Sequence, residues 1–569
     1  MTMLNSSLTS ATVTLQQLIN ASNCNSHHLA QALSAMRIAA DKTLTNQSAS
    51  NQRLTLVNLP FQQFRLDSRQ VASNDVFVLL KSHTPNCQKS RDYLYQAAKN
   101  AAFILSEIDP IALLATANVP PHANIELIDN AQATAQQQLD SLPCPVVYAP
   151  NIRDFLGDLI QARLQHQQPV TLPAVVAVTG TNGKTTISQL VAQLTQLTGM
   201  SSAVMGTAGN GRLGTLVQAS HTTGDALAVQ QFLYQMGREG AQLLALEASS
   251  HGLDQQRLQG MPVSVAIYTN LSRDHLDYHA DMAEYAAAKA KLFDKAHFPD
   301  LTHAIVNIDD EHAQIMLDTA HASELTVWTY SLDATKTATF VAAKIKPSLQ
   351  GVEISLRTDF GDGNVNNLDI VSPLLGRFNV ANLLAAMAAA VALEISLERI
   401  APVVPQLQGA VGRMQRVPSN DGCFIVDYAH TPDALSQVLA SLKTHCKGQL
   451  WAVFGCGGDR DAGKRPLMAQ AGLAGADQVI LTADNPRTED PQAILQDMQA
   501  GMSAEQYQRT HIEPARQKAI EYAVNQAAAD DIVVIAGKGH ETYQEINNVR
   551  YDFDDSIILQ NALEHAGRV

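Results

Sequence analysis

The sequence predicts an α/β protein with three domains, of which the central and C-terminal domains are built on mostly parallel sheets. Two observations predict this fold. A β-branched run, Val175–Thr179, ends at a glycine-rich loop that leads directly into a helical pattern, which is a strand–loop–helix unit of α/β proteins. Towards the C-terminus, four short apolar runs alternate with helix-length segments, as in a parallel sheet with both faces covered. The 569 residues suffice for about three or four domains.

Composition limits the classes of function. The chain is 46% hydrophobic and 16% charged, so it can bury substantial cores. Its formal net charge of −15 argues against a nucleic-acid or anionic-membrane partner, since those partners favour a basic surface. The longest apolar run, Leu383–Leu393, is far shorter than the roughly 20 residues that span a bilayer. Met1–Leu15 lacks the basic start of a signal peptide and the six cysteines form no CxxC pair, so we expect a cytoplasmic protein with free thiols.

The first domain is expected over residues 1–172, and residues 1–60 show no readable function. That segment is rich in Asn, Ser, Gln and Thr, with helices expected near Leu15–Ile19 and Leu29–Ile38. A small α/β pattern follows, in which Asp67-Ser68-Arg69 is typical of a turn or helix cap. Its other expected elements are a helix near Asp92–Asn100 and strands at Val76–Leu80, Ala102–Leu105 and Val146–Tyr148. The stretch Gln165–Pro173 predicts the first domain boundary.

The loop from Gly180 to Thr186, with the sequence Gly-Thr-Asn-Gly-Lys-Thr-Thr, organises the central domain, which is expected over residues 173–408. Such a loop directs backbone N–H groups and the positive end of a helix dipole at one point, which favours a bound phosphate. Lys184 would reach the terminal phosphates and the Thr185 hydroxyl would ligate Mg²⁺. Val178 stands where the full phosphate-loop pattern has its first glycine, so a plain glycine turn is the alternative. The following helix is expected to end at Gly199 and to bury one face, formed by Ile187, Leu190, Val191, Leu194 and Leu197.

Further polar groups follow the strands of the central domain. Glu247 ends the apolar run Leu243–Leu246, at the sheet edge where α/β proteins bind ligands. A third strand, Val265–Thr269, leads into the His- and Asp-rich segment Asn270–His279. Alone, such a segment is more often a solvated loop. Its place after a strand and downstream of the phosphate loop favours a functional site.

Two helical patterns complete the central domain. Lys289 lies in the first, within Ala286–Phe293. The second is the apolar run 383–393, which Gly376–Asn382 precedes. Because Asn is common at helix starts, the Asn residues of that segment are expected to cap the helix.

The C-terminal domain, expected over residues 409–569, should place four polar strand ends at one edge of its sheet. The predicted strands are Phe424–Val426, Leu450–Phe454, Val479–Thr482 and Ile532–Ile535. The polar segments that follow them are Asp427–His430, Gly455–Asp461, Asp484–Arg487 and Gly537–Glu541. Because the carboxyl ends of parallel strands meet at one edge, these segments predict a polar crevice.

In this order, the motifs are similar to those of the Mur ligase family, ATP-dependent enzymes that build the peptide stem of peptidoglycan precursors. The resemblance extends from about Arg65 to the C-terminus. The segments that carry it are Gly180–Thr186, Glu247–Arg257, Thr269–His279, Asp427–Leu435, Gly455–Met468, Asp484–Arg487 and Gly537–Glu541. It implies an N-terminal α/β domain that holds a uridine nucleotide, a central P-loop-type ATPase domain and a C-terminal Rossmann-like domain that receives an amino acid.

The resemblance also implies three sets of binding residues. A UDP-linked substrate would contact Leu66, Ser68, His83, His221, Thr222, Thr223, Ser249, Gln255 and Arg257. ATP would contact Gly180, Thr181, Asn182, Gly183, Lys184, Thr185, Thr186, Asn382, Arg413 and Asp427. The amino acid would contact Arg460, Asp484, Asn485, Pro486, Arg487, Gly537 and Glu541. His221 stands where the family commonly has Asn, which leaves that contact open.

A metal site and a modified lysine are implied as well. The resemblance places Mg²⁺ on Thr185, Glu247, His275 and Lys289, and makes Lys184 catalytic together with Glu247, His275 and Lys289. Thr185 and Glu247 are hard oxygen donors, which suit Mg²⁺. Lys289 occupies the position of the family's carbamylated lysine. An ammonium group would repel Mg²⁺, whereas a carbamate formed with CO₂ is an anionic oxygen donor, so we expect N6-carboxylysine at Lys289.

The implied reaction is the ATP-dependent addition of meso-2,6-diaminopimelate to the D-glutamate of UDP-N-acetylmuramoyl-L-alanyl-D-glutamate, through an acyl phosphate, by a monomeric enzyme. Arg487 favours this amino acid, since a guanidinium can pair with the distal carboxylate that lysine lacks. The candidate base for the attacking amine is His430. The alternatives are the lysine-adding relative, a folylpolyglutamate synthase, and a non-catalytic protein that binds a nucleotide sugar.

Overall fold

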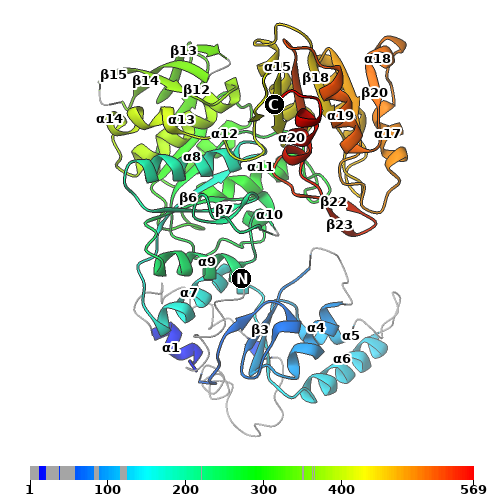
Figure 1. The fold of residues 1–569 in the computed structure, drawn as a ribbon. Helices are drawn as coiled ribbons and strands as arrows, with labels where there is room; N and C mark the ends of the chain where they lie inside the picture. Colours follow the sequence, from blue (N-terminus) through cyan, green and yellow to red (C-terminus); the bar gives the residue numbers. More distant parts are fainter. Residues whose placement is uncertain are drawn as a thin grey trace. The chain divides into compact units, whose positions relative to one another are not determined.

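The computed structural model describes residues 12–20, 37–38, 58–82, 89–115, 125–219, 221–348, 351–361, 363 and 365–569. They form two compact units (Figure 1). The first lies within Met1–Pro173, Gly224–Gly240 and Gln255–Met261, and the second within Ala174–Thr223, Ala241–Asp254 and Pro262–Val569. The two boundaries between the three domains expected from the sequence remain predictions. Within the described ranges, no helix has the length and apolar character needed to cross a membrane.

The first unit contains a five-stranded sheet in the order β1-β5-β4-β3-β2, in which only the β1–β5 pair is antiparallel. Its strands are β1 (Arg37–Ile38), β2 (Phe64–Arg65), β3 (Val76–Leu79), β4 (Phe103–Ser106) and β5 (Val146–Tyr148). Its α-helices are α1 (Leu15–Asn20), α4 (Lys89–Ala98), α5 (Pro110–Ala115), α6 (Ile125–Asp140), α7 (Leu156–Gln167) and α9 (Ala226–Arg238), and its 3-10 helices are η1 (Ser68–Gln70) and η2 (Ile152–Asp154).

Most of the elements expected in this unit are confirmed. Asp67 caps η1 by accepting the Arg69 backbone N–H at 3.0 Å, as the cap interpretation predicted. The predicted helix Leu29–Ile38 is wrong at its end, because Arg37 and Ile38 pair with β5 as strand β1; residues 29–36 lie outside the described residues. Helices α5, α6 and α7 have no counterpart among the predictions.

The second unit contains a ten-stranded sheet in the order β15-β14-β13-β12-β11-β10-β6-β9-β7-β8. Its strands are β6 (Ala174–Thr179), β7 (Ser202–Gly206), β8 (Gly209–Gly211), β9 (Leu243–Glu247), β10 (Val263–Tyr268), β11 (His303–Asn307), β12 (Thr326–Ser331), β13 (Phe340–Ser348), β14 (Gly351–Asp359) and β15 (Val365–Ser372). Neighbours from β13 to β7 are parallel, and the edge pairs β7–β8, β13–β14 and β14–β15 are antiparallel. The predicted strands correspond to β6, β9 and β10. Strands β11 to β15 have no counterpart among the predictions.

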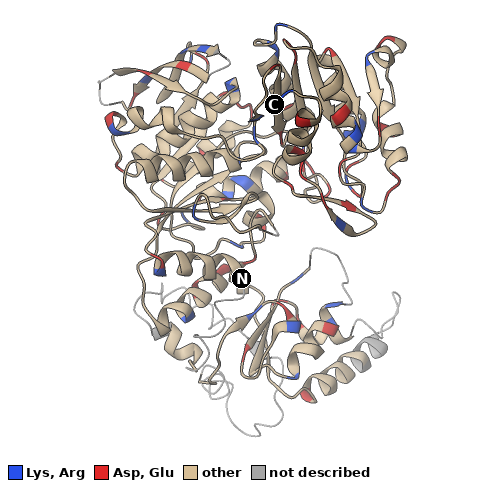
Figure 2. Cartoon of the chain, in the orientation of Figure 1, with Lys and Arg blue, Asp and Glu red and all other residues tan. Residues whose placement is uncertain are grey.

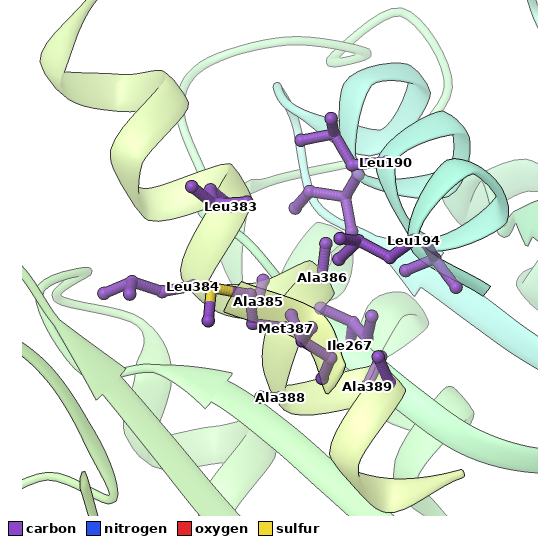
Figure 3. Packing of buried hydrophobic residues seen from close by; sticks show 14 of the residues in the cluster. Leu190, Leu194, Ile267, Leu383, Leu384, Ala385, Ala386, Met387, Ala388 and Ala389 are labelled. Atoms are coloured by element: carbon purple, nitrogen blue, oxygen red, sulfur yellow. The ribbon is translucent and has the colours of Figure 1, made fainter. Parts of the chain in front are cut away.

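Helices pack on this sheet around a large apolar core. They are α8 (Lys184–Leu197), α10 (Ser250–Asp254), α11 (Met282–Ala290), α12 (Ala313–Ala322), α13 (Arg377–Ala392) and α14 (Leu397–Ile400), with the 3-10 helices η3 (Lys291–Phe293) and η4 (Ala401–Gln406). Figure 3 shows Leu190 and Leu194 of α8 beside Leu383 and Met387 of α13, with Ile267 of β10 next to them. This core holds the phosphate loop between its strand and its helix.

Two helix predictions need correction. Leu197 is 39% exposed rather than buried, because it is the last residue of α8 and the chain turns away at Gly199 (φ +96°). The apolar helix begins at Arg377, with Gly376 as its N-cap, so Asn379 and Asn382 lie inside the helix and do not cap it. Both Asn side chains are buried, and their amide groups find partners within the helix and the residue just before it, because Asn379 donates to the Leu375 carbonyl and Asn382 donates to Asn379.

A second, six-stranded sheet follows in the order β16-β17-β21-β18-β19-β20, in which only β16–β17 is antiparallel. Its strands are β16 (Gln415–Val417), β17 (Cys423–Asp427), β18 (Leu450–Phe454), β19 (Gln478–Leu481), β20 (Thr510–Ile512) and β21 (Ile532–Ala536). The accompanying elements are α15 (Pro432–Lys443), α16 (Lys464–Gly475), α17 (Pro491–Gln499), α18 (Ala504–Gln508), α19 (Arg516–Gln526), α20 (Asp555–His565) and the hairpin β22 (Tyr543–Ile546)–β23 (Val549–Asp552). Helices α15, α16 and α17 contribute to one apolar cluster and α19 and α20 to another. The predicted parallel sheet with covered faces is thereby confirmed.

Candidate active site

The glycine loop between β6 and α8 has a shape that only glycine permits at two positions. Gly180 has φ +146°, and a Cβ there would lie 1.8 Å from the Thr269 hydroxyl oxygen. Gly183 has φ +91°, and a Cβ there would lie 2.7 Å from Oδ1 of Asn382. Asn270 stabilises the loop through two hydrogen bonds. Its carbonyl accepts the Thr181 N–H at 2.8 Å, and its Oδ1 accepts the Asn182 N–H at 2.9 Å. The predicted ATP residue Asn382 is therefore a direct neighbour of the loop.

Two lysines, the half-buried Lys184 and the buried Lys289, point at one carbonyl oxygen of this loop. Lys184 Nζ donates to the Gly180 carbonyl at 2.9 Å and to the Thr181 carbonyl at 2.8 Å. Lys289 Nζ, which is 1% exposed, donates to the same Gly180 carbonyl at 2.8 Å. Burial lowers the pKa of both lysines, and the charge of Lys184 lowers the pKa of Lys289 further, to well below its ordinary value. Burial and the neighbouring charge of Lys184 thus both favour the neutral amine form of Lys289.

The Glu247 carboxylate lies beside the hydroxyl of Thr185, which the resemblance assigns to the metal, and is linked through Thr207 to that of Thr222, which the resemblance assigns to the substrate. Its carboxylate accepts the Thr185 hydroxyl at 2.9 Å, and the Thr207 N–H and hydroxyl at 2.8 and 3.1 Å. The Thr222 hydroxyl lies 3.0 Å from the Thr207 hydroxyl oxygen and can donate to it. The carboxylate leaves no space for a side chain at Gly206, where a Cβ would lie 2.1 Å from Oε1. A buried carboxylate beside a hydroxyl is a hard-oxygen donor set, which fits Mg²⁺.

His275 is the histidine of the predicted metal set. Its backbone is left-handed (φ +55°), and burial lowers its pKa to about 4, with Lys184 and Lys289 acting in the same direction. The Tyr285 ring is a neighbour of both His275, at 5.9 Å between centroids, and Lys289, whose Nζ is 4.4 Å from the ring centroid. Among the described residues, no group of three or more His, Cys, Asp or Glu could hold a metal. A metal would therefore depend on Thr185 and on a modified Lys289 as well as on Glu247 and His275.

The remaining predicted ATP residues approach the loop from the second sheet. Arg413 is 3.5 Å from the Thr185 hydroxyl, through Nη2, and its guanidinium lies over the Tyr428 ring at 4.3 Å. Asp427 ends β17, and its two carboxylate oxygens accept the Met414 and Ala429 N–H groups at 2.7 Å each. The carboxylate therefore positions the turn that carries Arg413. Further lone pairs on its oxygens remain for ribose hydroxyls.

The strand ends of the second sheet do converge, as predicted. Asn485 donates to Oε2 of Glu541 at 2.9 Å, and the Gly537 N–H donates to the Asp427 carbonyl at 3.0 Å. Lys538, which sequence reasoning did not single out, has no exposed side-chain surface and is 3.6 Å from Asp484. Its signal in the sequence was its position inside the polar segment Gly537–Glu541, flanked by two glycines.

Arg487 owes its position to an element that the sequence did not reveal. Its backbone has φ +52° and bonds to the hairpin β22–β23, since its N–H donates to the Glu545 carbonyl at 2.9 Å and its carbonyl accepts the Asn547 N–H at 2.6 Å. Its Nη1 donates to the Gly458 carbonyl at 2.7 Å. The hairpin carries acidic and basic side chains (Figure 2). Pro486 is buried beside Gly458, and Arg460 is exposed on the same loop.

The predicted uridine-nucleotide residues divide between the two units. In the first unit, the buried Ser68 donates to Gln96 at 2.8 Å, Leu66 packs partly against the core, and Arg257 donates twice to Oε1 of Gln255. In the second unit, Thr222, Thr223 and Ser249 lie around Glu247, with Thr223 donating to the Glu247 carbonyl at 2.8 Å, and His221 is exposed. His83 lies outside the described residues.

His430, the candidate base, has the right protonation state. Its Nδ1 is 3.0 Å from the Tyr428 carbonyl, which can only accept, so the proton sits on Nδ1 and Nε2 has a free lone pair. Burial lowers its pKa to about 4, so the ring is neutral near pH 7.

Comparison with known proteins decides the family. Residues 178–390 match the Mur ligase middle domain, and residues 412–539 match the Mur ligase glutamate ligase domain. The UDP-N-acetylmuramoyl-L-alanyl-D-glutamate–2,6-diaminopimelate ligase of Pseudomonas aeruginosa is 41% identical over 508 residues, which cover 89% of this chain and 96% of that protein. The chain belongs to the Mur ligase family. This Mur ligase is therefore an ATP-dependent enzyme that forms amide bonds.

Two further relatives agree with this assignment. The protein of the same name from Chromobacterium violaceum is 38% identical over 524 residues, covering 90% of this Mur ligase and 97% of that protein. A solved structure of a UDP-N-acetylmuramoyl-L-alanyl-D-glutamate–2,6-diaminopimelate ligase is 41% identical, covers 98% of this chain and 100% of its own, and has a TM-score of 0.65. The expected α/β fold and family resemblance are confirmed.

Proposed function

We propose that this Mur ligase joins meso-2,6-diaminopimelate to the D-glutamate of UDP-N-acetylmuramoyl-L-alanyl-D-glutamate in cytoplasmic peptidoglycan precursor synthesis. The observation that carries the choice of amino acid is that Arg487 stands in the same short segment as Asp484 and Asn485, at the strand end where Asn485 donates to Glu541 at 2.9 Å. A guanidinium beside carboxylates matches an amino acid with a carboxylate and an ammonium at its far end. The relatives that are about 40% identical carry the name of this reaction. A folylpolyglutamate synthase from Mycobacterium tuberculosis is only 19% identical, a likeness of fold alone.

The reaction begins at the phosphate loop. The γ-carboxylate of the D-glutamate attacks the γ-phosphorus of ATP, the bond to the β-phosphate oxygen breaks and ADP leaves; this step is needed because a free carboxylate is a poor electrophile. Lys184 exchanges its bonds to the Gly180 and Thr181 carbonyls for the phosphate oxygens, and Arg413, next to Thr185, neutralises further phosphate charge. The diaminopimelate amine then attacks the acyl phosphate, with His430 as the proposed proton acceptor, and phosphate leaves.

Mg²⁺ and a carbamate complete the proposed site. Thr185, Glu247, His275 and a carbamylated Lys289 would hold Mg²⁺, which neutralises phosphoryl charge when bound. The shared Gly180 carbonyl favours the modification, since two ammonium groups on one oxygen repel each other and a neutral Lys289 amine is the form that adds CO₂. The carbamylated side chain would bring anionic oxygens to a place now occupied by a buried amine.

The deciding experiment measures phosphate release with ATP, the UDP-linked dipeptide and a panel of amino acids. We expect release only when both the dipeptide and diaminopimelate are present. Release with lysine in place of diaminopimelate would identify the lysine-adding activity, release with ATP alone would indicate a simple ATPase, and binding of the dipeptide without release would indicate a non-catalytic protein. The UDP-linked substrate is proposed to contact the nine residues assigned to it from the sequence.

A further inference from the structure

Lys538 is a buried cation in the proposed amino-acid pocket. It follows Gly537 after β21, and its side chain has no exposed surface. Its Nζ lies 3.2 Å from Oδ1 of Asn485, 3.2 Å from Oε2 of Glu541 and 3.6 Å from Oδ1 of Asp484. A lysine is almost never fully buried unless it is paired, so these partners indicate what it does.

The carboxylates of this pocket outnumber its ammonium groups by one, so one further cation would balance their charge. Two carboxylates, Asp484 and Glu541, face the single ammonium of Lys538, which leaves one net negative charge. Burial and the charge of Asp484 raise the pKa of Glu541, and Lys538 opposes that rise. Arg516 of α19 also faces both carboxylates, but Asp555 holds it through bonds of 2.8 and 2.7 Å.

Two tyrosines face the same charges from other elements. Tyr428, after β17, has its pKa raised by burial first and then by Glu541 and Asp484. The ring of Tyr543, on β22, lies 5.6 Å from Lys538 Nζ, and Glu541 raises its pKa while Arg487 lowers it. Arg487 is joined to the same strand, because its N–H donates to the Glu545 carbonyl of β22 at 2.9 Å.

One carboxylate oxygen of the pocket accepts no hydrogen bond. Oδ1 of Asp484 is buried and, among the described residues, has only the ion pair with Lys538 Nζ at 3.6 Å, which is too long for a hydrogen bond. A buried carboxylate oxygen normally accepts a hydrogen bond, and a ligand with N–H groups supplies the donor. This oxygen and the net negative charge of the pocket point to the same missing group, an ammonium.

We propose that Lys538 is a positioning residue that holds Asp484 and Glu541 at one net negative charge, so that the pocket accepts one ammonium while Arg487 accepts one carboxylate. This inference rests on the proposed function, which already assigns a zwitterionic far end of the amino acid to this pocket, and adds the role of Lys538 in setting the charge of the pocket. The distal end of diaminopimelate is such a group. Lysine lacks its carboxylate and 2-aminopimelate lacks its ammonium, so each leaves a buried charge unpaired.

The test compares Lys538→Met, Glu541→Gln and the double variant by amino-acid-dependent phosphate release, with Lys518→Met, an exposed lysine of α19, as the matched control. We expect Lys538→Met to raise the KM for diaminopimelate about tenfold to a hundredfold, with kcat nearly unchanged. The double variant restores one net negative charge, so its KM should fall below that of Lys538→Met. As the pH is raised, the KM of Lys538→Met should fall relative to wild type, because Glu541 without its lysine partner has to lose a proton before it binds the ammonium. Lys518→Met should stay within about twofold of wild type.

Several results would overturn the proposal. A KM for Lys538→Met equal to that of wild type, or a double variant with a higher KM than both single variants, would show that Lys538 only fills space. If Lys538→Met does not fold, the test rests on Glu541→Gln. This variant should lose most of the wild-type preference for diaminopimelate over 2-aminopimelate. An unchanged preference would refute the charge argument. Wild-type enzyme that releases no phosphate with diaminopimelate would instead refute the proposed function.

Discussion

Replacing Arg487 by alanine should damage diaminopimelate binding and spare catalysis. The Arg487 side chain is 23% exposed, and the nearest carboxylate to its Nε is that of Glu545, 4.0 Å away. Loss of a buried Arg–carboxylate partner costs about 2–5 kcal/mol, and partial exposure places Arg487 at the lower end, about 2–3 kcal/mol. That range corresponds to a rise of about 30- to 150-fold in the KM for diaminopimelate. Because Arg487 is proposed to bind the far end of the amino acid, kcat should change little.

The assay is phosphate release over a range of diaminopimelate and lysine concentrations. Lysine has no distal carboxylate, so its KM should be nearly the same in Arg487→Ala as in wild type. The matched control is Arg550→Ala, because Arg550 lies in the hairpin, is 63% exposed and is 3.9 Å from the same Glu545 carboxylate. An exposed pair of this kind changes binding by less than about fivefold. If Arg487→Ala keeps the wild-type preference for diaminopimelate over lysine, the assignment of Arg487 to the carboxylate is wrong.

Three further outcomes are expected. With ¹³C-bicarbonate, wild-type protein should show a carbamate carbonyl signal by NMR that Lys289→Ala lacks; a signal of equal size in the variant would place the carbamate elsewhere. Gly180→Ala should abolish ADP binding measured by calorimetry and lower the melting temperature, because the new Cβ would lie 1.8 Å from the Thr269 hydroxyl; normal ADP affinity would contradict the loop geometry. Burial lowers the pKa of His430 and His540 to about 4 in the folded protein, against 6.5 for an unperturbed histidine, so the unfolded chain binds more protons between these values. The free energy of unfolding measured in urea should therefore fall as the pH is lowered from about 6.5 to about 4, by up to about 3 kcal/mol per histidine. The fall should be less steep in His430→Gln, and an equal slope in that variant would exclude His430 as a contributor.

The sequence alone determined the phosphate loop and the polar ends of four of the six strands in the second sheet, β17, β18, β19 and β21. Both are local: a strand, a glycine loop and a helix start follow each other within a few residues, and a strand end lies where its apolar run stops. The convergence of Asp484, Asn485 and Glu541 was also predictable, because parallel strands bring their carboxyl ends to one edge.

The tertiary structure decided what depends on residues far apart in the chain. Lys289 reaches the Gly180 carbonyl across 109 positions, and no sequence period predicts that two lysines share one oxygen. The start of α13 was hidden because buried Asn residues interrupt its apolar run. The hairpin that holds Arg487 and the charge balance at Lys538 likewise follow from packing. The spacing of side chains along the sequence predicts single helices and strands, whereas a binding site forms where several of them pack together.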